Sequence, residues 1–409
     1  MKPAFDIFLV SPQAHYPSHY WTDTLALMQA LHQRDLRVRT VVFSAGTELI
    51  PVNQRERVEP VFHRLPFPWN RLAMGKTQYR RRVKLMFNCE TFVCLVKALR
   101  MARECANPIL HFIGGSFWPI LLAVPRFRRL RFVYRLYGGL LPKQARPATA
   151  SPRSRSLLES VLRRALSTGR LDFVCETELI YSEARPVAGP HIRVIPYAVD
   201  DQEELPAQEE ARRQLGLPAT EKILLFFGTH RQEKDYRTAL NGCLRLPEPP
   251  LALFVGKVIS DNDPRLVVTE CRYPKARIVD EFVPAEMVKL YFAAADAVAL
   301  PYEANFSRGS GVLIECCRYL RPMIASATPY FSAFIACYGC GVTFASGDST
   351  SFAGAARLLL ANATAYRAAL ERARHEHSWP VVTNQYLELY ASILARDGAS
   401  SLGSGCQAA

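Results

Sequence analysis

One feature restricts the fold of this chain more than any other: short apolar runs alternate with longer segments of helical spacing. The run DIFLVS at residues 6–11 is typical of a buried strand. The next segment, residues 22–35, repeats leucine and methionine at helical spacing, and LRVRTVVFS at 36–44 is again typical of a strand. Alternating strands and helices predict an α/β fold in which helices cover both faces of a parallel sheet.

The same alternation continues along both halves of the chain. In the first half, the pattern predicts a long helix at 82–105 and strands at 108–114, 131–138, 171–177 and 191–200. In the second half, it predicts strands at 222–228, 251–257, 276–282, 296–302 and 321–326. Helices are predicted between them at 235–246, 284–295, 311–319 and 349–376. Two such series predict two Rossmann-like domains with a cleft where their strand carboxyl ends face each other.

A polar, acidic and proline-punctuated segment, residues 201–222, separates the two series and is typical of a linker. The chain has 409 residues, which exceeds what one hydrophobic core usually serves. We therefore expect domains at 1–198 and 199–378. An amphipathic helix follows at 379–397, and the small and polar residues 398–409 predict a disordered tail.

The net charge of +14 favours a polyanionic partner, whether nucleic acid, an anionic membrane or a phosphorylated substrate. Basic residues gather at 76–84, 126–131 and 153–170. These clusters are compatible with a solvated face and with docking to an anionic membrane. No helix-turn-helix, zinc-finger or RNP signature accompanies the charge, so we expect no nucleic-acid partner.

Eleven cysteines without a secretory signal at the start predict reduced thiols and a cytoplasmic location. Cys337 and Cys340 lack a second pair at zinc-binding spacing, so no metal site is expected. The uncharged run at 114–125 is too short and too proline-broken to span a bilayer. Any membrane association is therefore expected to be peripheral.

The loop NFSRGSG at 305–311 lies between a predicted strand and a predicted helix. A helix N-terminus offers unpaired N–H groups and a positive dipole end to an anion. Gly309, Ser310 and Gly311 are small enough to allow a close approach. The loop therefore predicts a phosphate site, and a plain helix cap by Ser310 is compatible with it.

Four segments together resemble a known family: FFGTHRQEKDYRTAL at 226–240, VDEFVPAEMVKLYFAAADAVALPY at 279–302, SGVLIECCRYLRPMIAS at 310–326 and HSWPVVTNQYLELYASIL at 377–394. Their order is similar to the C-terminal half of retaining nucleotide-sugar glycosyltransferases of the glycogen-synthase-like, family 4-like group. The resemblance implies a GT-B fold with two Rossmann-like domains and a C-terminal helix that crosses back to the first domain. It covers about residues 190–395, and the first half matches only in its alternation.

The resemblance implies a donor site in the second half. Arg231 and Lys234 match the family's basic pair, which would hold a diphosphate next to Gly228 and stabilise its charge as the sugar departs. Glu315 matches the second glutamate of a paired-glutamate motif, which implies hydrogen bonds to the ribose hydroxyls. The loop residues expected to complete the donor site are Arg308, Gly309, Ser310, Gly311 and Val312.

The first glutamate of that motif is replaced by Ser307, which departs from the family pattern. That carboxylate would hold a sugar hydroxyl. Ser307 or Glu303 is expected to take its place, or the donor sugar differs from the family's usual one.

In the first half, His111 ends a predicted strand and is a candidate catalytic residue at the sugar or acceptor, with a core role as the alternative. The loop after the first strand is aromatic rather than glycine-rich. We interpret His15, Tyr16, His19 and Tyr20 as an acceptor wall, because aromatic faces pack on sugar rings and apolar acceptors.

We therefore expect a metal-independent hexosyltransferase that moves a sugar from a nucleoside diphosphate donor, UDP- or GDP-linked, to a hydroxyl acceptor. Retention of the anomeric configuration is implied by the resemblance. No cofactor is expected. A glycan, a lipid-linked sugar or a small molecule each fits as acceptor, and polysaccharide biosynthesis fits as the setting. The alternatives are a catalytically silent nucleotide-sugar binder of the same fold and a basic scaffold for membranes or nucleic acid. Asp261 and Asp263 resemble a metal-binding pair, but their loop does not suit that role.

Overall fold

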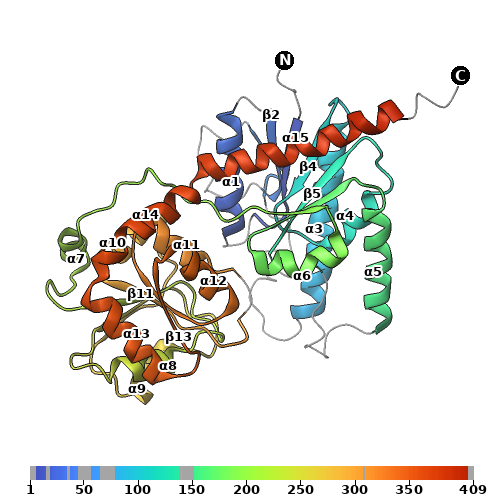
Figure 1. The fold of residues 1–409 in the computed structure, drawn as a ribbon. Helices are drawn as coiled ribbons and strands as arrows, with labels where there is room; N and C mark the ends of the chain where they lie inside the picture. The colour runs from blue at the N-terminus through green and yellow to red at the C-terminus, as the bar shows by residue number, and fades with distance from the viewer. Residues whose placement is uncertain are drawn as a thin grey trace, which may run out of the picture. The chain divides into compact units, whose positions relative to one another are not determined.

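The computed structural model describes residues 6–14, 19–34, 37–44, 57–64, 79–137, 140, 152–306 and 309–403. The chain forms two compact units (Figure 1). Unit 1 comprises residues 1–196 together with 382–409, and unit 2 comprises residues 197–381. Each unit contains one parallel sheet with helices packed on it, so the expectation of two Rossmann-like units is confirmed.

The described part of unit 1 contains a sheet in the order β3-β2-β1-β4-β5-β6-β7, in which every neighbouring pair is parallel. Its strands are β1 (Asp6–Ser11), β2 (Arg37–Ser44), β3 (Val58–Phe62), β4 (Pro108–Phe112), β5 (Arg131–Leu136), β6 (Leu171–Cys175) and β7 (Ile192–Val194). Its helices are α1 (His19–His32), α3 (Tyr79–Ala102), α4 (Phe117–Ala123), α5 (Pro152–Leu166), α6 (Glu178–Ala188) and α15 (Trp379–Gly403).

Side chains alternate between the two faces of this sheet. Phe112 and Phe173 belong to a core with α3, α4, α5 and α6 on one face. His111 and Arg135 point to the other face, where they meet buried tyrosines of α15. The far end of the sequence therefore completes the core of the first unit (Figure 1).

Helix α15 continues to Gly403, so residues 398–403 are helical where we expected the start of a disordered tail. No proline interrupts the segment after Pro380. Extending a helix from an anchored stretch is much easier than starting one, because only the first turn carries the cost of nucleation. Residues 404–409 lie outside the described part of the chain.

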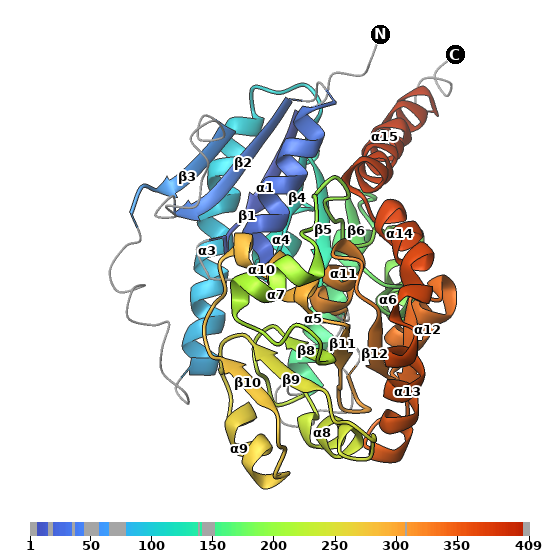
Figure 2. The ribbon, with the colours of Figure 1, turned by 90° about the vertical axis from the view of Figure 1, so that its left-hand side faces the viewer.

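Unit 2 contains a parallel sheet in the order β10-β9-β8-β11-β12-β13, and Figure 2 shows β10, β9, β8, β11 and β12 side by side in that order. Its strands are β8 (Ile223–Phe227), β9 (Leu251–Val255), β10 (Ala276–Val279), β11 (Ala297–Leu300), β12 (Met323–Ser326) and β13 (Gly341–Phe344). Its helices are α7 (Gln208–Leu215), α8 (Tyr236–Cys243), α9 (Pro264–Glu270), α10 (Ala285–Ala294), α11 (Gly311–Arg318), α12 (Pro329–Tyr338), α13 (Ser349–Ala361), the 3-10 helix η2 (Ala363–Tyr366) and α14 (Arg367–Glu376).

The strands of this sheet are almost continuous runs of buried apolar residues, as expected when helices cover both faces. In unit 2, two hydrophobic clusters lie on opposite faces: Leu225 and Phe292 belong to one, and Phe226 and Phe254 to the other. Among the helices that the structure describes in either unit, none has the length and apolar character required to cross a bilayer.

Candidate functional site

The strand order of unit 2 places a topological switch point between β8 and β11. From β8 the chain builds outward through β9 to β10, then returns to β11 and builds the other way to β13. The loops after β8 and β11, residues 228–235 and 301–310, therefore leave neighbouring strands in opposite directions. In open α/β sheets, ligands bind beside the carboxyl ends of the strands at such a point.

Lys234 lies in the first of these loops. Its side chain is 7% exposed, and its Nζ donates hydrogen bonds to the backbone oxygens of Phe227 at 2.7 Å and Gly228 at 3.4 Å. Burial, and next the nearby Arg231 guanidinium, lower the pKa of Lys234 to about 7, while Glu233 opposes the shift. An anion placed beside this ammonium would stabilise its charged form.

Gly228 brings the Lys234 loop against the start of α11. It has a φ of +84°, which favours glycine. A Cβ atom there would lie 3.2 Å from Val312 Cγ2 and 3.7 Å from Lys234 Nζ. Three residues that the sequence placed in one donor site therefore meet in the structure, and a side chain at Gly228 would crowd the space between them.

Arg231 lies in the same loop as Lys234 and is exposed. Its Nε donates a hydrogen bond to Thr229 Oγ1 at 2.9 Å. Its backbone oxygen accepts a hydrogen bond from the Lys234 backbone N–H at 3.2 Å, which closes a turn. The guanidinium of Arg231 therefore belongs to a loop with an ordered backbone.

A second loop holds this backbone in place. Asn262 Nδ2 donates to the backbone oxygens of Arg231 at 2.9 Å and Lys234 at 2.6 Å. Ser260 Oγ donates to the backbone oxygen of His230 at 3.1 Å. Asn262 lies in the segment SDNDP, which sequence reasoning considered only for its carboxylates. Asp263 accepts a hydrogen bond from the Arg265 backbone N–H and thereby caps α9.

His230, which sequence reasoning did not select, is the fully buried residue of the loop 228–235, which we call the basic loop after Arg231 and Lys234. Its Nδ1 lies 2.6 Å from the Tyr236 hydroxyl. Burial, and next the charge of Lys234, lower the pKa of His230 to about 4, so the imidazole is neutral near pH 7. His230 therefore packs the basic loop onto the sheet without adding charge.

The loop after β11 ends at the N-terminus of α11. Ser310 occupies the N-cap position with an extended backbone, but its side chain makes no capping hydrogen bond. Its Oγ is buried and has no partner among the described residues. A Cβ atom at Gly311 would meet nothing within 4 Å, so open space lies before the first turn. The unpaired N–H groups of that turn suit an anion. Gly309 precedes them, and Ser307 and Arg308 lie outside the described residues.

Glu315 lies one turn into α11 and is partly exposed. Its carboxylate is 3.7 Å from Arg318, with which it forms an ion pair. Glu303 is exposed in the turn that follows β11, where its backbone oxygen accepts a hydrogen bond from the Phe306 N–H at 3.0 Å. A ribose-binding role for Glu315 and a sugar-binding role for Glu303 stay predictions.

His111, in unit 1, does not lie at an open loop end. It is fully buried, and its Nδ1 is 2.7 Å from the Tyr390 hydroxyl of α15. Burial, and next the Arg135 guanidinium, lower the pKa of His111 to about 3. These contacts favour the alternative role in the core over the expected catalytic one, because no surface of the ring is exposed to a substrate.

The side chains expected to form the acceptor wall of unit 1 lie outside the part of the chain that the structure describes. His15 and Tyr16 lie outside the described residues, and His19 and Tyr20 begin α1 with only their backbone described.

Within the described residues of both units, no group of three or more histidine, cysteine, aspartate and glutamate side chains is placed to hold a metal ion. Metal independence stays a prediction.

Residues 207–376 match the family model described as Glycosyl transferases group 1. Over 224 residues, the chain is 27% identical to TuaC of Bacillus subtilis (strain 168), a glycosyltransferase that its name assigns to teichuronic acid biosynthesis. The aligned region covers 53% of this chain and 50% of TuaC, so the chain spans about half the length of this curated relative.

Two solved structures resemble the whole chain. Sucrose-phosphate synthase from Thermosynechococcus elongatus superposes with a TM-score of 0.70 at 18% identity, over 96% of this chain and 100% of that one. Anabaena HepE, solved in complex with UDP, superposes with a TM-score of 0.68 at 14% identity, over 95% of this chain and 100% of that one. The fold is GT-B.

The GT-B fold predicted from the sequence is thereby confirmed, and the residues that match the family model lie within unit 2. The matched residues 207–376 include the basic loop, the Asn262 loop and all of α11. The geometry at the switch point of this GT-B chain thus falls inside the region that the family model describes.

Proposed function

We propose that this chain is a glycosyltransferase that moves a sugar from a nucleoside diphosphate sugar to a hydroxyl acceptor. The observation that carries the proposal is the meeting of Lys234, Gly228 and the first turn of α11 at the switch point of unit 2. A buried ammonium beside unpaired helix amides is suited to a diphosphate group.

In the proposed reaction, Lys234, Arg231 and the amides from Gly309 to Val312 stabilise the negative charge that grows on the leaving diphosphate. Stabilisation of that charge lowers the barrier only if it is stronger in the transition state than in the bound donor. The partly neutral Lys234 meets this condition, because a growing negative charge favours its protonated form.

We further propose that the reaction retains the anomeric configuration and requires no metal. The leaving phosphate takes the proton of the acceptor hydroxyl on the same face of the sugar, so no protein nucleophile is required. We propose a UDP-sugar as the donor. HepE, a structure of the same fold, was solved with UDP and with UDP-glucose, and this supports the choice of base.

The decisive test is donor binding by calorimetry with UDP-, GDP-, ADP-, CMP- and dTDP-sugars. We expect one nucleotide to bind selectively, and Lys234→Met to weaken that binding about 30-fold or more, because a charge-assisted contact is worth roughly 2 kcal/mol or more. Arg231→Gln should weaken it as well, whereas Arg245→Gln, an exposed arginine elsewhere in unit 2, should not. Equal binding by all variants would rule out this site.

Turnover separates the proposal from its two rivals. Release of free nucleoside diphosphate in the presence of an acceptor mixture identifies an enzyme, and selective binding without release identifies a silent binder. A basic scaffold would ignore every nucleotide sugar and bind polyanions with strong salt dependence.

We also propose that unit 1 docks on an anionic membrane through α3, α4 and α5, which pack side by side. Four large apolar side chains on these helices are between 49% and 66% exposed: Leu85, Phe92, Leu122 and Leu157. Exposed arginines accompany them at 126, 128, 129, 163 and 164. Apolar groups that enter the interface next to cations suit a surface of anionic lipids.

Sedimentation with vesicles tests this surface. We expect binding to phosphatidylglycerol vesicles that falls steeply in 0.5 M salt, and little binding to phosphatidylcholine. Phe92→Ser with Leu157→Ser should reduce the binding, and Leu358→Ser, a 63% exposed leucine of unit 2, should not. Equal loss in both cases would place the contact elsewhere.

A further inference from the structure

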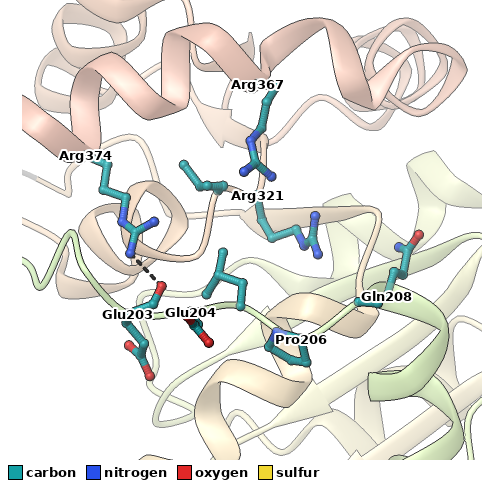
Figure 3. Close-up of a pocket in the computed structure, with 10 residues that line it drawn as sticks. Glu203, Glu204, Pro206, Gln208, Arg321, Arg367 and Arg374 are labelled. Atoms are coloured by element: carbon teal, nitrogen blue, oxygen red, sulfur yellow. Dashed lines mark hydrogen bonds between the residues drawn. The ribbon is translucent and has the colours of Figure 1, made fainter.

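Unit 2 contains a pocket of about 510 Å³ that none of the donor-site residues lines. It lies where the segment before α7, the turn after α11 and helix α14 meet. Three arginines line it: Arg321, Arg367 and Arg374 (Figure 3). This volume is in the range of sites for small organic ligands.

Glu203 and Glu204, the carboxylates that line the pocket, form no ion pair with these three arginines, and Arg367 pairs instead with Glu371, which does not line it. Glu203 lines the pocket, but its carboxylate pairs with Arg318 at 2.8 Å and Lys289 at 4.0 Å. Arg374 reaches only the backbone oxygen of Glu203, at 2.8 Å (Figure 3), and that of Asp200, at 3.4 Å. The Nε atom of Arg374 is buried and has no partner in the described part of the chain. The other lining carboxylate, Glu204, is exposed to solvent.

Arg321 is partly buried at the pocket. Its Nε and Nη2 donate to the backbone oxygens of Phe292 and Ala293, near the end of α10. Burial, and next the nearby Arg367 guanidinium, lower the pKa of Arg321 to about 10. The two cations therefore repel each other, and an anion between them would relieve that repulsion.

One helix begins at the pocket and adds to its positive potential. Helix α7 begins at Gln208 without a side-chain cap on its first turn. Helix α14 follows η2 directly, and the backbone N–H of its first residue, Arg367, donates to the backbone oxygen of Thr364, so α14 adds no free N–H group at this residue. The unpaired N–H groups and the positive dipole end of α7 act in the same direction as the guanidinium groups.

A neighbouring pocket gives room for more than a bare anion. It has a volume of about 450 Å³ and shares Gln208, Leu320, Arg321 and Arg367 with the first. It extends from these residues to Asn362 and Thr364, which can form hydrogen bonds with hydroxyl groups.

We propose that the two pockets together bind a phosphorylated small molecule, whose phosphate contacts Arg321, Arg367 and Arg374 and whose polar remainder lies toward Asn362. Bidentate binding by guanidinium groups is the usual way in which proteins hold a phosphate. The donor loop meets the first residue of α11, and this pocket meets the turn after its last one. About 12 Å of helix therefore separates the two sites.

Calorimetry with inorganic pyrophosphate as the probe tests the proposal. We expect two pyrophosphate ions per wild-type chain, one at the proposed donor site and one at the arginine pocket. In the double variant Arg367→Gln, Arg374→Gln, the affinity of the arginine pocket for pyrophosphate should fall at least tenfold. The same variant should bind the UDP-sugar as the wild type does. The control Arg245→Gln should keep both.

Arg374 also supports the backbone, so the single variant Arg367→Gln serves if the double variant does not fold. Arg367 is exposed and pairs with Glu371 at 2.6 Å, so its loss should leave the fold intact while weakening pyrophosphate binding about threefold or more. Unchanged pyrophosphate binding in the folded pocket variants would overturn the proposal, as would an equal loss in Arg245→Gln.

The two sites fail independently in this design. Arg231→Gln should weaken pyrophosphate binding at the donor site and leave binding at the arginine pocket unchanged, whereas the pocket variants should do the reverse. If nucleotide sugars do not bind at all but pyrophosphate binding still depends on Arg367, the proposed donor site is wrong and the arginine pocket stands.

Discussion

Lys234 combines a buried position with a pKa near that of water-exposed histidine. In the free protein its pKa is lowered to about 7, so in most molecules the Lys234 side chain is neutral at pH 8. A bound diphosphate favours the ammonium and raises this pKa, and the protein must then take up a proton from the buffer.

Calorimetry in two buffers of different ionisation enthalpy measures that uptake. At pH 8 we expect up to about one proton taken up per nucleotide bound. Lys234→Arg carries a guanidinium that stays protonated with and without ligand, so its uptake should be close to zero. The same uptake in both proteins would mean that Lys234 does not face the bound diphosphate.

Asn262 acts on the donor site through the backbone. Its amide donates to the backbone oxygens of Arg231 and Lys234, and the two bonds hold the main chain from which both cationic side chains extend. We expect Asn262→Ala to weaken donor binding about tenfold, since each hydrogen bond contributes roughly 1 kcal/mol. The melting temperature should change little.

Asn241→Ala is a suitable control, because Asn241 is an exposed asparagine on the neighbouring helix α8. An Asn262→Ala protein that binds the donor normally would show that the basic loop keeps its shape without the two hydrogen bonds from Asn262.

The residues of this site differ in how far sequence could predict them. Gly228, Lys234 and Val312 follow from a family pattern, and the structure brings them together. Asn262 and His230 leave no comparable signal, because they support the site through main-chain oxygens and a buried hydroxyl. His111 contacts Tyr390, which lies 279 positions away in the sequence. A local sequence pattern cannot reveal a contact between residues so far apart.

At the scale of elements, α15 joins its sheet through polar as well as apolar contacts. Arg396 pairs with Asp172 of β6 at 2.7 Å, and Tyr390 meets His111 of β4 at 2.7 Å. Both partners point to the face opposite the phenylalanine core. This face of unit 1 is therefore a polar joint, in which the loss of a hydrogen-bond partner leaves a buried polar atom unsatisfied.

Tyr390→Phe should destabilise unit 1. It leaves His111 Nδ1 buried without its partner, which costs about 1–3 kcal/mol and corresponds to a fall in melting temperature of roughly 5 °C. Scanning calorimetry measures the change. Tyr366→Phe in unit 2 removes a hydroxyl that makes no hydrogen bond to the described residues, and it should leave the melting temperature unchanged. An equal fall in melting temperature for both substitutions would contradict a stabilising role of the Tyr390–His111 contact.

The elements themselves were unequally predictable. The long helix α3 follows from the length of its segment, and the buried strand β8 follows from its unbroken apolar run. Short elements such as β3, α4 and α12 were not predicted. Five residues with a central proline carry little strand signal, and a short apolar run fits a helix and a strand equally well.

At the scale of the whole molecule, the sequence order and the structural units do not coincide. Residues 382–409 belong to unit 1 although all of unit 2 precedes them. A chain that ends at Val381 should therefore keep the transition of unit 2 and lose or greatly lower that of unit 1. A chain that ends at Asp397 retains Tyr386, Tyr390 and Arg396, and it should melt as the full chain does.

Scanning calorimetry with limited proteolysis distinguishes these outcomes. Loss of α15 exposes the buried charges of Arg135 and Glu176, so protease cuts should concentrate in unit 1. A full-strength transition of unit 1 in the shorter chain would show that α15 adds little to its stability.

The position of α15 also sets an order of events during synthesis. The ribosome makes residues 1–196 first, but Tyr386 and Tyr390 emerge only after all of unit 2 has been made. Domains usually fold from the N-terminus onward during translation. In this chain we therefore expect unit 2 to be complete first, and we expect His111 and Arg135 to remain uncovered until α15 has been made.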